Sequence, residues 1–189
     1  MGEAPKVNPA LAVTALRLIE EKLHYDPLPV HYLPFKVRRR TDCWIAGGSL
    51  RDRDWTPYKN DIDLWTPDPQ AVCLLLLEAD WAKVQEVEYQ PGEVSTKLVH
   101  VAGSWGTMFW LDLLTGKSPE ETILNFDYTV NCIAYAFGRK ELIYHPDWKE
   151  HREKKLLVRL PNGQFISKAR LEHMQKKGYH EPSNDSDRP

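Results

Sequence analysis

Residues 43–65, which read CWIAGGSLRDRDWTPYKNDIDLW, decide the fold of this chain. The stretch opens with a short apolar run at 43–46, which is typical of a buried strand. Gly47, Gly48 and Ser49 follow, and then a short polar segment that can begin a helix. Glycine lets a backbone pass close to a phosphate, and the free N–H groups of a helix start favour an anion. The order therefore predicts a turn that is suited to phosphate.

Polar and apolar residues alternate from Asn60 to Trp65. This period of two predicts a half-buried strand that carries Asp61 and Asp63 on one face and points Ile62 into a core. Residues two apart on a strand are about 6.5 Å apart at the backbone, so both carboxylates can converge on a pair of divalent ions. Taken alone, such a pair is also typical of a solvated strand face, and a Gly-Gly-Ser turn is also typical of an ordinary turn. Their combination favours phosphoryl transfer.

The order of strand, glycine turn, eleven residues and Asp-apolar-Asp strand resembles the signature of the polymerase-beta-type nucleotidyltransferase superfamily. GGSLRD at 47–52 and PYKNDID at 57–63 are similar to the GGxVRD and PKDxD motifs of the head domain of CCA-adding enzymes and bacterial poly(A) polymerases. NFDYTVNCIAY at 125–135 resembles the RRDFTINALAY segment of that family, with Asn125 and Phe126 in place of the two arginines. In the family these arginines link head to neck and hold the nucleotide site. The resemblance therefore does not define which nucleotide this chain prefers.

Asp112 is the only charged residue in the almost continuously apolar run Met108–Leu114. Burying a lone carboxylate is costly unless it meets a cation or several hydrogen-bond donors. A strand-end aspartate that caps a turn is the alternative interpretation. The resemblance implies a third metal ligand on a strand beside the first two. It thus implies that Asp61, Asp63 and Asp112 are catalytic and hold two Mg²⁺ ions, or Mn²⁺ in their place.

The resemblance also implies a set of nucleotide-binding residues, which are Gly47, Gly48, Ser49, Arg51, Lys59, Asp127 and Asn131. The glycines and the serine would cradle the β and γ phosphates, with Arg51 or Lys59 adding positive charge. Either basic side chain has an alternative partner in Asp52 or Asp54. Asp127 and Asn131 would line the base or ribose, or would pair with each other as residues four apart on a helix.

The remaining pattern predicts an α+β protein with the nucleotidyltransferase fold, a mixed and mainly antiparallel sheet of about five strands with helices packed on one face. Residues 1–160 are predicted to form the head domain, including an N-terminal helix from Asn8 to Tyr25. Residues 161–179 are predicted to carry a basic C-terminal helix, and residues 180–189 a disordered tail.

Two basic segments have two interpretations each. Lys36 and Arg38 to Arg40 lie directly before the first strand, and Ile166 to Lys177 form the basic amphipathic helix. Each is typical of a solvated surface, or of a contact to the triphosphate or to the phosphates of an acceptor nucleic acid.

Composition excludes several classes of protein. The net charge is −2, so no global basicity marks a nucleic-acid binder, and any such surface must be local. The three cysteines lack a C-x-x-C spacing and indicate reduced thiols rather than disulfides or zinc ligands. No signal peptide or membrane-spanning run is present, so we expect a cytoplasmic protein with no membrane partner.

Three functions are compatible with these residues. The first is transfer of a nucleoside monophosphate from an NTP to an acceptor hydroxyl with release of pyrophosphate, the acceptor being RNA and tRNA-like. The second is the same chemistry on a protein or small molecule, as in toxin-like or antibiotic-modifying relatives. The third is a non-catalytic nucleotide- or RNA-binding module, against which the retention of all three carboxylates argues. The chain ends where the family's neck would begin, so we expect a stand-alone head without body and tail, which does not favour CCA addition.

Overall fold

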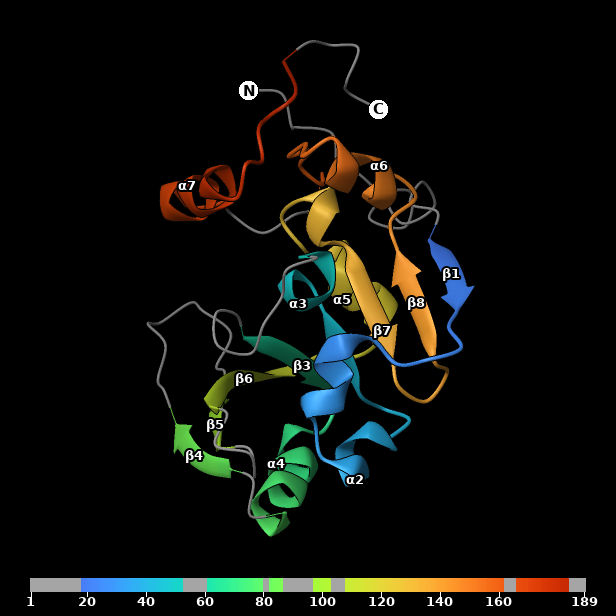
Figure 1. Cartoon of the computed structure of the whole chain (residues 1–189), viewed down its shortest axis with the longest axis vertical. Coiled ribbons are helices and arrows are strands. Elements are labelled where there is room, and N and C mark those ends of the chain that lie inside the picture. Colours follow the sequence, from blue (N-terminus) through green and yellow to red (C-terminus); the bar gives the residue numbers. More distant parts are fainter. Residues whose placement is uncertain are drawn as a thin grey trace, which may run out of the picture.

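The computed structural model describes residues 18–52, 61–79, 82–86, 97–102, 108–161 and 166–183, with the backbone alone given for 82–86, 97–102 and 108–110. The predictions for residues 8–17, for Lys59 and for the end of the tail at 184–189 lie outside these ranges. The described residues form one sheet with helices around it (Figure 1).

The sheet contains eight strands in the order β1-β8-β7-β2-β3-β6-β5-β4. Neighbouring strands are antiparallel except β3 and β6, which run parallel. The mixed, mainly antiparallel α+β fold is therefore confirmed, with more strands than the predicted five. The strands are β1 (Ile19–Lys22), β2 (Trp44–Ala46), β3 (Ile62–Thr66), β4 (Ala82–Glu86), β5 (Lys97–Ala102), β6 (Met108–Thr115), β7 (Ile133–Ala136) and β8 (Glu141–Tyr144).

Strand β1 corrects the prediction of a helix that continues to Tyr25. Ile19–Lys22 pair with β8 instead, and all four side chains are exposed. Cross-strand contacts hold this edge strand, because Glu21 accepts hydrogen bonds from Tyr144 and Lys149. The helical spacing of apolar residues was a weak signal here, and pairing with a neighbouring strand outweighed it.

Three helix ends lie at residues whose chemistry favours a helix start or end. The Asp68 side chain accepts from the N–H of Ala71 at the start of α4, and Ser118 accepts from Glu121 at the start of α5. Gly178, with φ of 84°, follows the end of α7. The helices are α2 (Phe35–Arg38), α3 (Gly48–Arg51), α4 (Pro69–Glu78), α5 (Pro119–Leu124), α6 (Trp148–Glu153) and α7 (Lys168–Lys176), with 3-10 turns η1 (Leu28–Tyr32) and η2 (Thr129–Asn131).

Apolar side chains cover both faces of the sheet. One face, which carries Ile45, Ile62 and Leu111, packs under η1, α2 and α4. Helices lie on both faces of the sheet, because α5 packs on the other one, whereas the sequence predicted helices on one face. The opposite face carries Trp44 and Trp65 and adds a second core against α5. Because side chains alternate along β3, the face of Trp65 is also the face of Asp63. This alternation places the candidate site on the α5 side of the sheet.

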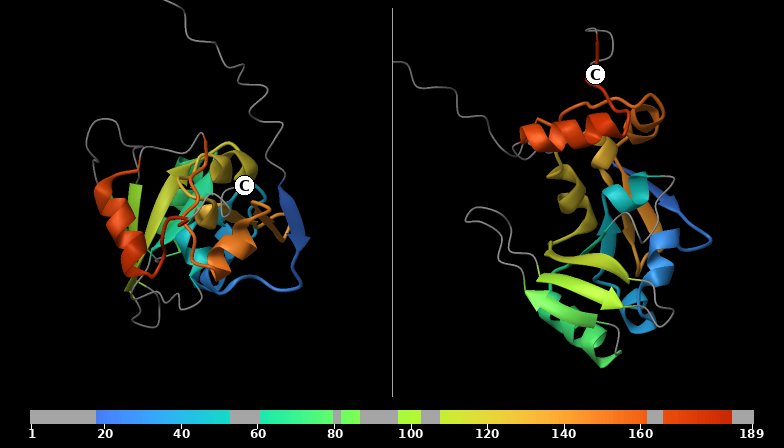
Figure 2. Two further views of the ribbon diagram at one scale, coloured as in Figure 1. Left: turned by 90° about the horizontal axis from the view of Figure 1, so that it is seen from above. Right: turned by 60° about the vertical axis from the view of Figure 1, so that its left-hand side comes forward.

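Helices α6 and α7 lie at the end of the molecule that is remote from α4 (Figure 2). Met174 of α7 and the following Tyr179 are buried in a small cluster with Tyr128, Val130 and Leu157. All three cysteines are free and buried, as predicted. Within the described residues, no helix has the length and apolar character that crossing a membrane requires.

Candidate metal centre

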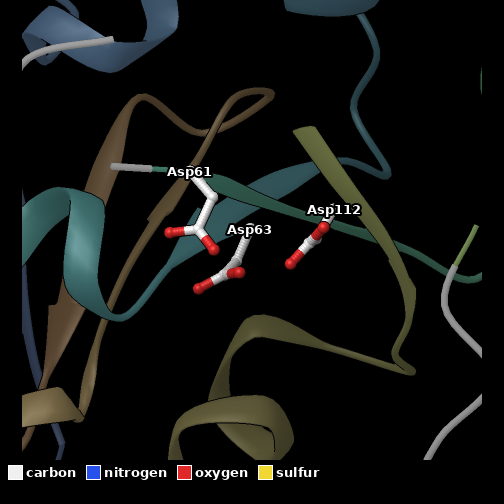
Figure 3. A group of neighbouring side chains, drawn as sticks. All are labelled: Asp61, Asp63 and Asp112. Atoms are coloured by element: carbon white, nitrogen blue, oxygen red, sulfur yellow. The ribbon is translucent and has the colours of Figure 1, made fainter. Parts of the chain in front are cut away.

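The parallel pairing of β3 with β6 brings together aspartates that are far apart in the sequence. Asp63 lies directly opposite Asp112 in this pair, and Asp61 immediately precedes β3. One carboxylate oxygen from each of the three lies within 4.8 Å of the others. Figure 3 shows the three side chains gathered at one place on the sheet. We call Asp61, Asp63 and Asp112 the triad; their meeting was predicted, and their role as metal ligands stays a prediction.

The triad concentrates negative charge in a partly buried place. Burial and the neighbouring carboxylates of Asp61 and Asp112 raise the pKa of Asp63 to about 8. Burial and Asp61 likewise raise the pKa of Asp112 to about 6. Carboxylates in such an arrangement repel one another at neutral pH, and a bound cation would offset that repulsion.

One oxygen of the triad lacks any partner inside the protein. Asp112 Oδ1 is buried and accepts no hydrogen bond from the described part of the chain. An unpaired buried carboxylate oxygen costs stability unless a ligand meets it. Carboxylate oxygens are the ligands that Mg²⁺ and Mn²⁺ prefer, so the donor set fits these ions.

The glycine turn lies against the triad. Gly47 has φ of 79°, a conformation that L side chains rarely adopt, and a Cβ at this position would lie 3.4 Å from Asp63 Oδ2. Gly48 begins α3, and the hydroxyl of Ser49 is buried without a hydrogen-bond partner among the described residues. The turn thus leaves space beside Asp63, and the unpartnered hydroxyl of Ser49 lies two residues after Gly47. Binding of phosphate by these three residues stays a prediction.

Arg51 forms an ion pair with Asp52, which was the alternative role predicted for it. Its Nε lies 2.6 Å from Asp52 Oδ1, and its Nη1 donates to the Oδ1 of Asn131. Lys177, which directly follows α7, contacts the same aspartate, with Nζ 2.8 Å from Oδ2. Hydrogen bonds from both basic side chains outweigh burial and lower the pKa of Asp52 to about 2. The guanidinium, 3% exposed, therefore holds α3 to α7, and its nucleotide-binding role stays a prediction.

Asp127 and Asn131 do pair with each other, through Asn131 Nδ2 and Asp127 Oδ1. They do so around the 3-10 turn η2 rather than on the predicted helix, because α5 ends at Leu124. Arg170 of α7 also reaches Asp127, with Nε 2.9 Å from Oδ2. Arg170 of α7 and Lys177, directly after it, thus tie this helix to the head by ion pairs, the arrangement expected of a structural cap. Roles of Asp127 and Asn131 in holding a base or ribose stay predictions.

Phe126 is the site residue whose place the sequence did not reveal. Its ring packs edge-on against Trp65, with centroids 6.2 Å apart, and reaches within 3.6 Å of the position of a Gly47 Cβ. It therefore borders the triad, at a position where the resembled motif has an arginine. The replacement of the motif's arginine by Phe126 was visible in the sequence and marked this position as unusual. It did not predict what the phenyl ring would contact.

Known structures share this fold. A structure described as "tRNA-processing enzyme (apo form I)" superposes with a TM-score of 0.52 at 17% identity, over 74% of this chain and 38% of that chain. The Thermotoga maritima CCA-adding enzyme complexed with tRNA gives 0.48 at 14% identity, over 73% and 38%. A CCA-adding enzyme with CTP gives 0.48 at 15% identity, over 63% and 29%. This chain thus spans well under half of their lengths. A search of curated proteins found no match.

The topology and the superposition with a TM-score of 0.52 define a protein with the nucleotidyltransferase fold. A sequence profile described as "Gabija anti-defense 2 family protein" (Gad2) matches residues 19–155. The chain therefore belongs to the Gabija anti-defense 2 family.

Proposed function

We propose that this protein is a metal-dependent nucleotidyltransferase, which moves a nucleoside monophosphate from an NTP to an acceptor hydroxyl. The observation that carries the proposal is the triad: three carboxylates from two strands meet within 4.8 Å, and one buried oxygen has no partner among the described residues. A cluster that raises the pKa of its own carboxylates costs stability, which favours a functional reason for it.

In the proposed reaction, a bond forms between the acceptor oxygen and the α-phosphorus of the NTP, and the bond to the β-phosphate oxygen breaks. Pyrophosphate leaves and the acceptor hydroxyl loses its proton to solvent. Asp61, Asp63 and Asp112 would hold the divalent ions. When bound, such ions favour the deprotonated acceptor hydroxyl and stabilise charge on the triphosphate and the departing pyrophosphate.

The other residues around the triad would position the nucleotide. Gly47, which has no side chain, lets a phosphate approach Asp63 through the space that a Cβ would fill. The unpartnered Ser49 hydroxyl would donate a hydrogen bond to a phosphate oxygen. The half-buried ring of Phe126 would offer an apolar surface to the nucleotide in place of the arginine of the resembled motif. This change predicts a contact by packing rather than by charge.

For the acceptor we propose RNA. The support is the shared fold of a structure described as a tRNA-processing enzyme. The chain spans 38% of that protein, so the regions outside the fold carry nothing over to this chain.

The family name favours a second acceptor class, a protein. It indicates that members act against a defence system called Gabija. Attachment of a nucleoside monophosphate to a hydroxyl of a defence protein would add a charge and a bulky group, which can disrupt an interface or an active site. In this case the chemistry at the triad is unchanged and only the acceptor differs.

The test uses NTPs labelled at the α- or at the γ-phosphate, incubated with the protein, Mg²⁺ and either total RNA or a bacterial protein extract. Nucleotidyl transfer puts the α label, and never the γ label, into the acceptor. Label in RNA supports the first acceptor, and label in protein supports the second. Asp63→Asn should abolish the labelling, whereas Glu78→Gln, on α4 over the other face, should not alter it. Bound NTP without any labelled acceptor in either fraction would contradict the enzyme and favour a binding module.

A further inference from the structure

A second pocket lies on the other face of the sheet from the triad. It has a volume of about 280 Å³. Tyr135, one of the residues that line it, faces the core under η1 and α2, because it is paired with Ile45 of that face. We call this site the back-face pocket and define it by Asp26, Phe35, Arg38, Arg39, Tyr135 and Lys140.

Three cations line this pocket without a carboxylate partner. Among the described residues, no ion pair involves Arg38, Arg39 or Lys140. Other basic side chains behave differently, since Arg40 pairs with Asp42 and Lys36 with Glu78. A group of unpaired cations around one concavity attracts an anion. In the basic run at 36–40, which the sequence left open between solvated surface and phosphate contact, Lys36 and Arg40 therefore have carboxylate partners, whereas Arg38 and Arg39 have none among the described residues.

Arg38 is the most constrained of the three. It lines the pocket from α2, and its Nε is buried with no hydrogen-bond partner in the part of the chain that the structure describes. A buried donor of a charged group that lacks an acceptor lowers the stability of the folded protein. A bound oxyanion would supply the missing acceptor, and a guanidinium binds phosphate with two parallel N–H groups.

Lys140 enters the pocket from a strained backbone. It lies in the turn between β7 and β8 with φ of 54°, in the left-handed region that a lysine rarely adopts. Such strain persists where the position is useful for another reason. The turn delivers the lysine side chain to the pocket that Arg38 and Arg39 also line.

Two other parts of the pocket, the Asp26 carboxylate and the Phe35 ring, are suited to groups other than a phosphate. Tyr135 donates its hydroxyl to Asp26 Oδ1, which fixes the carboxylate at the pocket and leaves its second oxygen to accept from a ligand. A fixed carboxylate beside phosphate-binding groups is suited to a ribose hydroxyl. Phe35 is 60% exposed, and the guanidinium of Arg39 lies 4.7 Å from its ring centroid. An exposed ring braced by an arginine is suited to stacking with a base.

We propose that the back-face pocket binds a ribonucleotide, either free or as part of an RNA chain. Arg38, Arg39 and Lys140 hold the phosphate, Asp26 accepts from the ribose and Phe35 contacts the base. The site is separate from the triad and does not depend on the function proposed for it.

The test is isothermal titration of the full chain carrying Asp63→Asn, in EDTA, so that metal-dependent binding at the triad does not contribute. The probes are each ribonucleoside monophosphate, its 2′-deoxy form, inorganic phosphate and a short single-stranded RNA. Arg39→Ala should weaken ribonucleotide binding by at least about tenfold. Lys36→Ala is the matched control, because Lys36 lies on the same helix, pairs with Glu78 and does not line the pocket. It should leave the affinity within about twofold of the parent.

Lys140→Gly keeps the proposal testable if an arginine variant fails to fold. Glycine adopts this backbone conformation freely, so the variant should be at least as stable as the parent and still lose affinity. Tighter binding of RNA than of any mononucleotide would identify an RNA chain as the natural source, and the reverse a free nucleotide. Unchanged affinity in Arg39→Ala and Lys140→Gly would overturn the proposal, as would no binding of any probe. Equal binding of inorganic phosphate or of deoxynucleotides would overturn the assignment to a ribonucleotide.

Discussion

Replacing Asp112 by asparagine is expected to stabilise the metal-free protein while it removes a proposed metal ligand. The carboxylate lies in a partly buried cluster, where burial and Asp61 raise its pKa to about 6. A group whose folded pKa is raised contributes stability that is present below the unfolded pKa of about 4 and is lost as the pH rises through about 6. At about pH 8 the folded protein therefore carries the full cost of ionising this group.

The size of the effect follows from the same pKa. The difference from an ordinary aspartate corresponds to about 3 kcal/mol at most, and relaxation and solvent reduce it, so we expect about 1–2 kcal/mol. For a protein of this length that is a rise in Tm of roughly 3–6 °C. An asparagine amide also donates hydrogen bonds to the two remaining carboxylates, which acts in the same direction.

The assay is thermal or denaturant unfolding in EDTA at about pH 8, repeated with saturating Mg²⁺. Mg²⁺ should raise the Tm of the wild-type chain and have much less effect on the Tm of Asp112→Asn. The difference in Tm between the two proteins should therefore become smaller or change sign. Glu78→Gln on α4 controls for loss of a surface carboxylate and should respond to Mg²⁺ like the wild type. An Asp112→Asn protein that is less stable in EDTA, or equally stabilised by Mg²⁺, would refute the electrostatic account of the triad.

Three other perturbations test the surroundings. Gly47→Ala places a Cβ 3.4 Å from a triad oxygen at a left-handed φ, so it should destabilise the folded protein by about 1 kcal/mol or more. It should also lower the affinity for NTP in equilibrium titration. Unchanged affinity would argue against the phosphate role of the turn. Asp52→Ala removes the partner of the buried Arg51 guanidinium and should cost about 3–5 kcal/mol in denaturant unfolding, against no more than about 1 kcal/mol if the pair were solvated. Burial lowers the pKa of His145 and His151, so the unfolded chain binds these protons at a higher pH than the folded chain does. The free energy of unfolding should therefore fall as the pH is lowered from about 7 to about 5. His151→Gln should flatten that slope in a pH series of unfolding curves, and an unchanged slope would show that other groups cause it.

The triad was predictable because its signals are local and chemical. The alternation of polar and apolar residues around Asp61 and Asp63 predicts which strand face they share. A lone carboxylate at Asp112 in an apolar run indicates that a cation or hydrogen-bond donors lie near it. The resemblance implied that Asp112 lies on a strand beside the other two aspartates. That the two segments pair in parallel, with Asp63 opposite Asp112, is a property of the sheet that the sequence did not reveal.

Other features depended on tertiary pairing that periodicity does not encode. Ile19–Lys22 lie in a longer segment whose apolar residues recur at helical spacing, yet they form an edge strand because β8 offers backbone partners and Glu21 accepts a hydrogen bond from Tyr144. The back-face pocket likewise combines Asp26, the α2 segment and Lys140, which only the folded sheet brings together.

Binding of Mn²⁺, measured from the loss of the free-ion signal in electron paramagnetic resonance, tests the central claim most directly. The account predicts that the wild-type chain binds Mn²⁺, that a non-hydrolysable NTP analogue tightens the binding, and that Asp61→Asn, Asp63→Asn and Asp112→Asn each lose it. Equal Mn²⁺ binding by the wild type and by a chain with all three substitutions would contradict it.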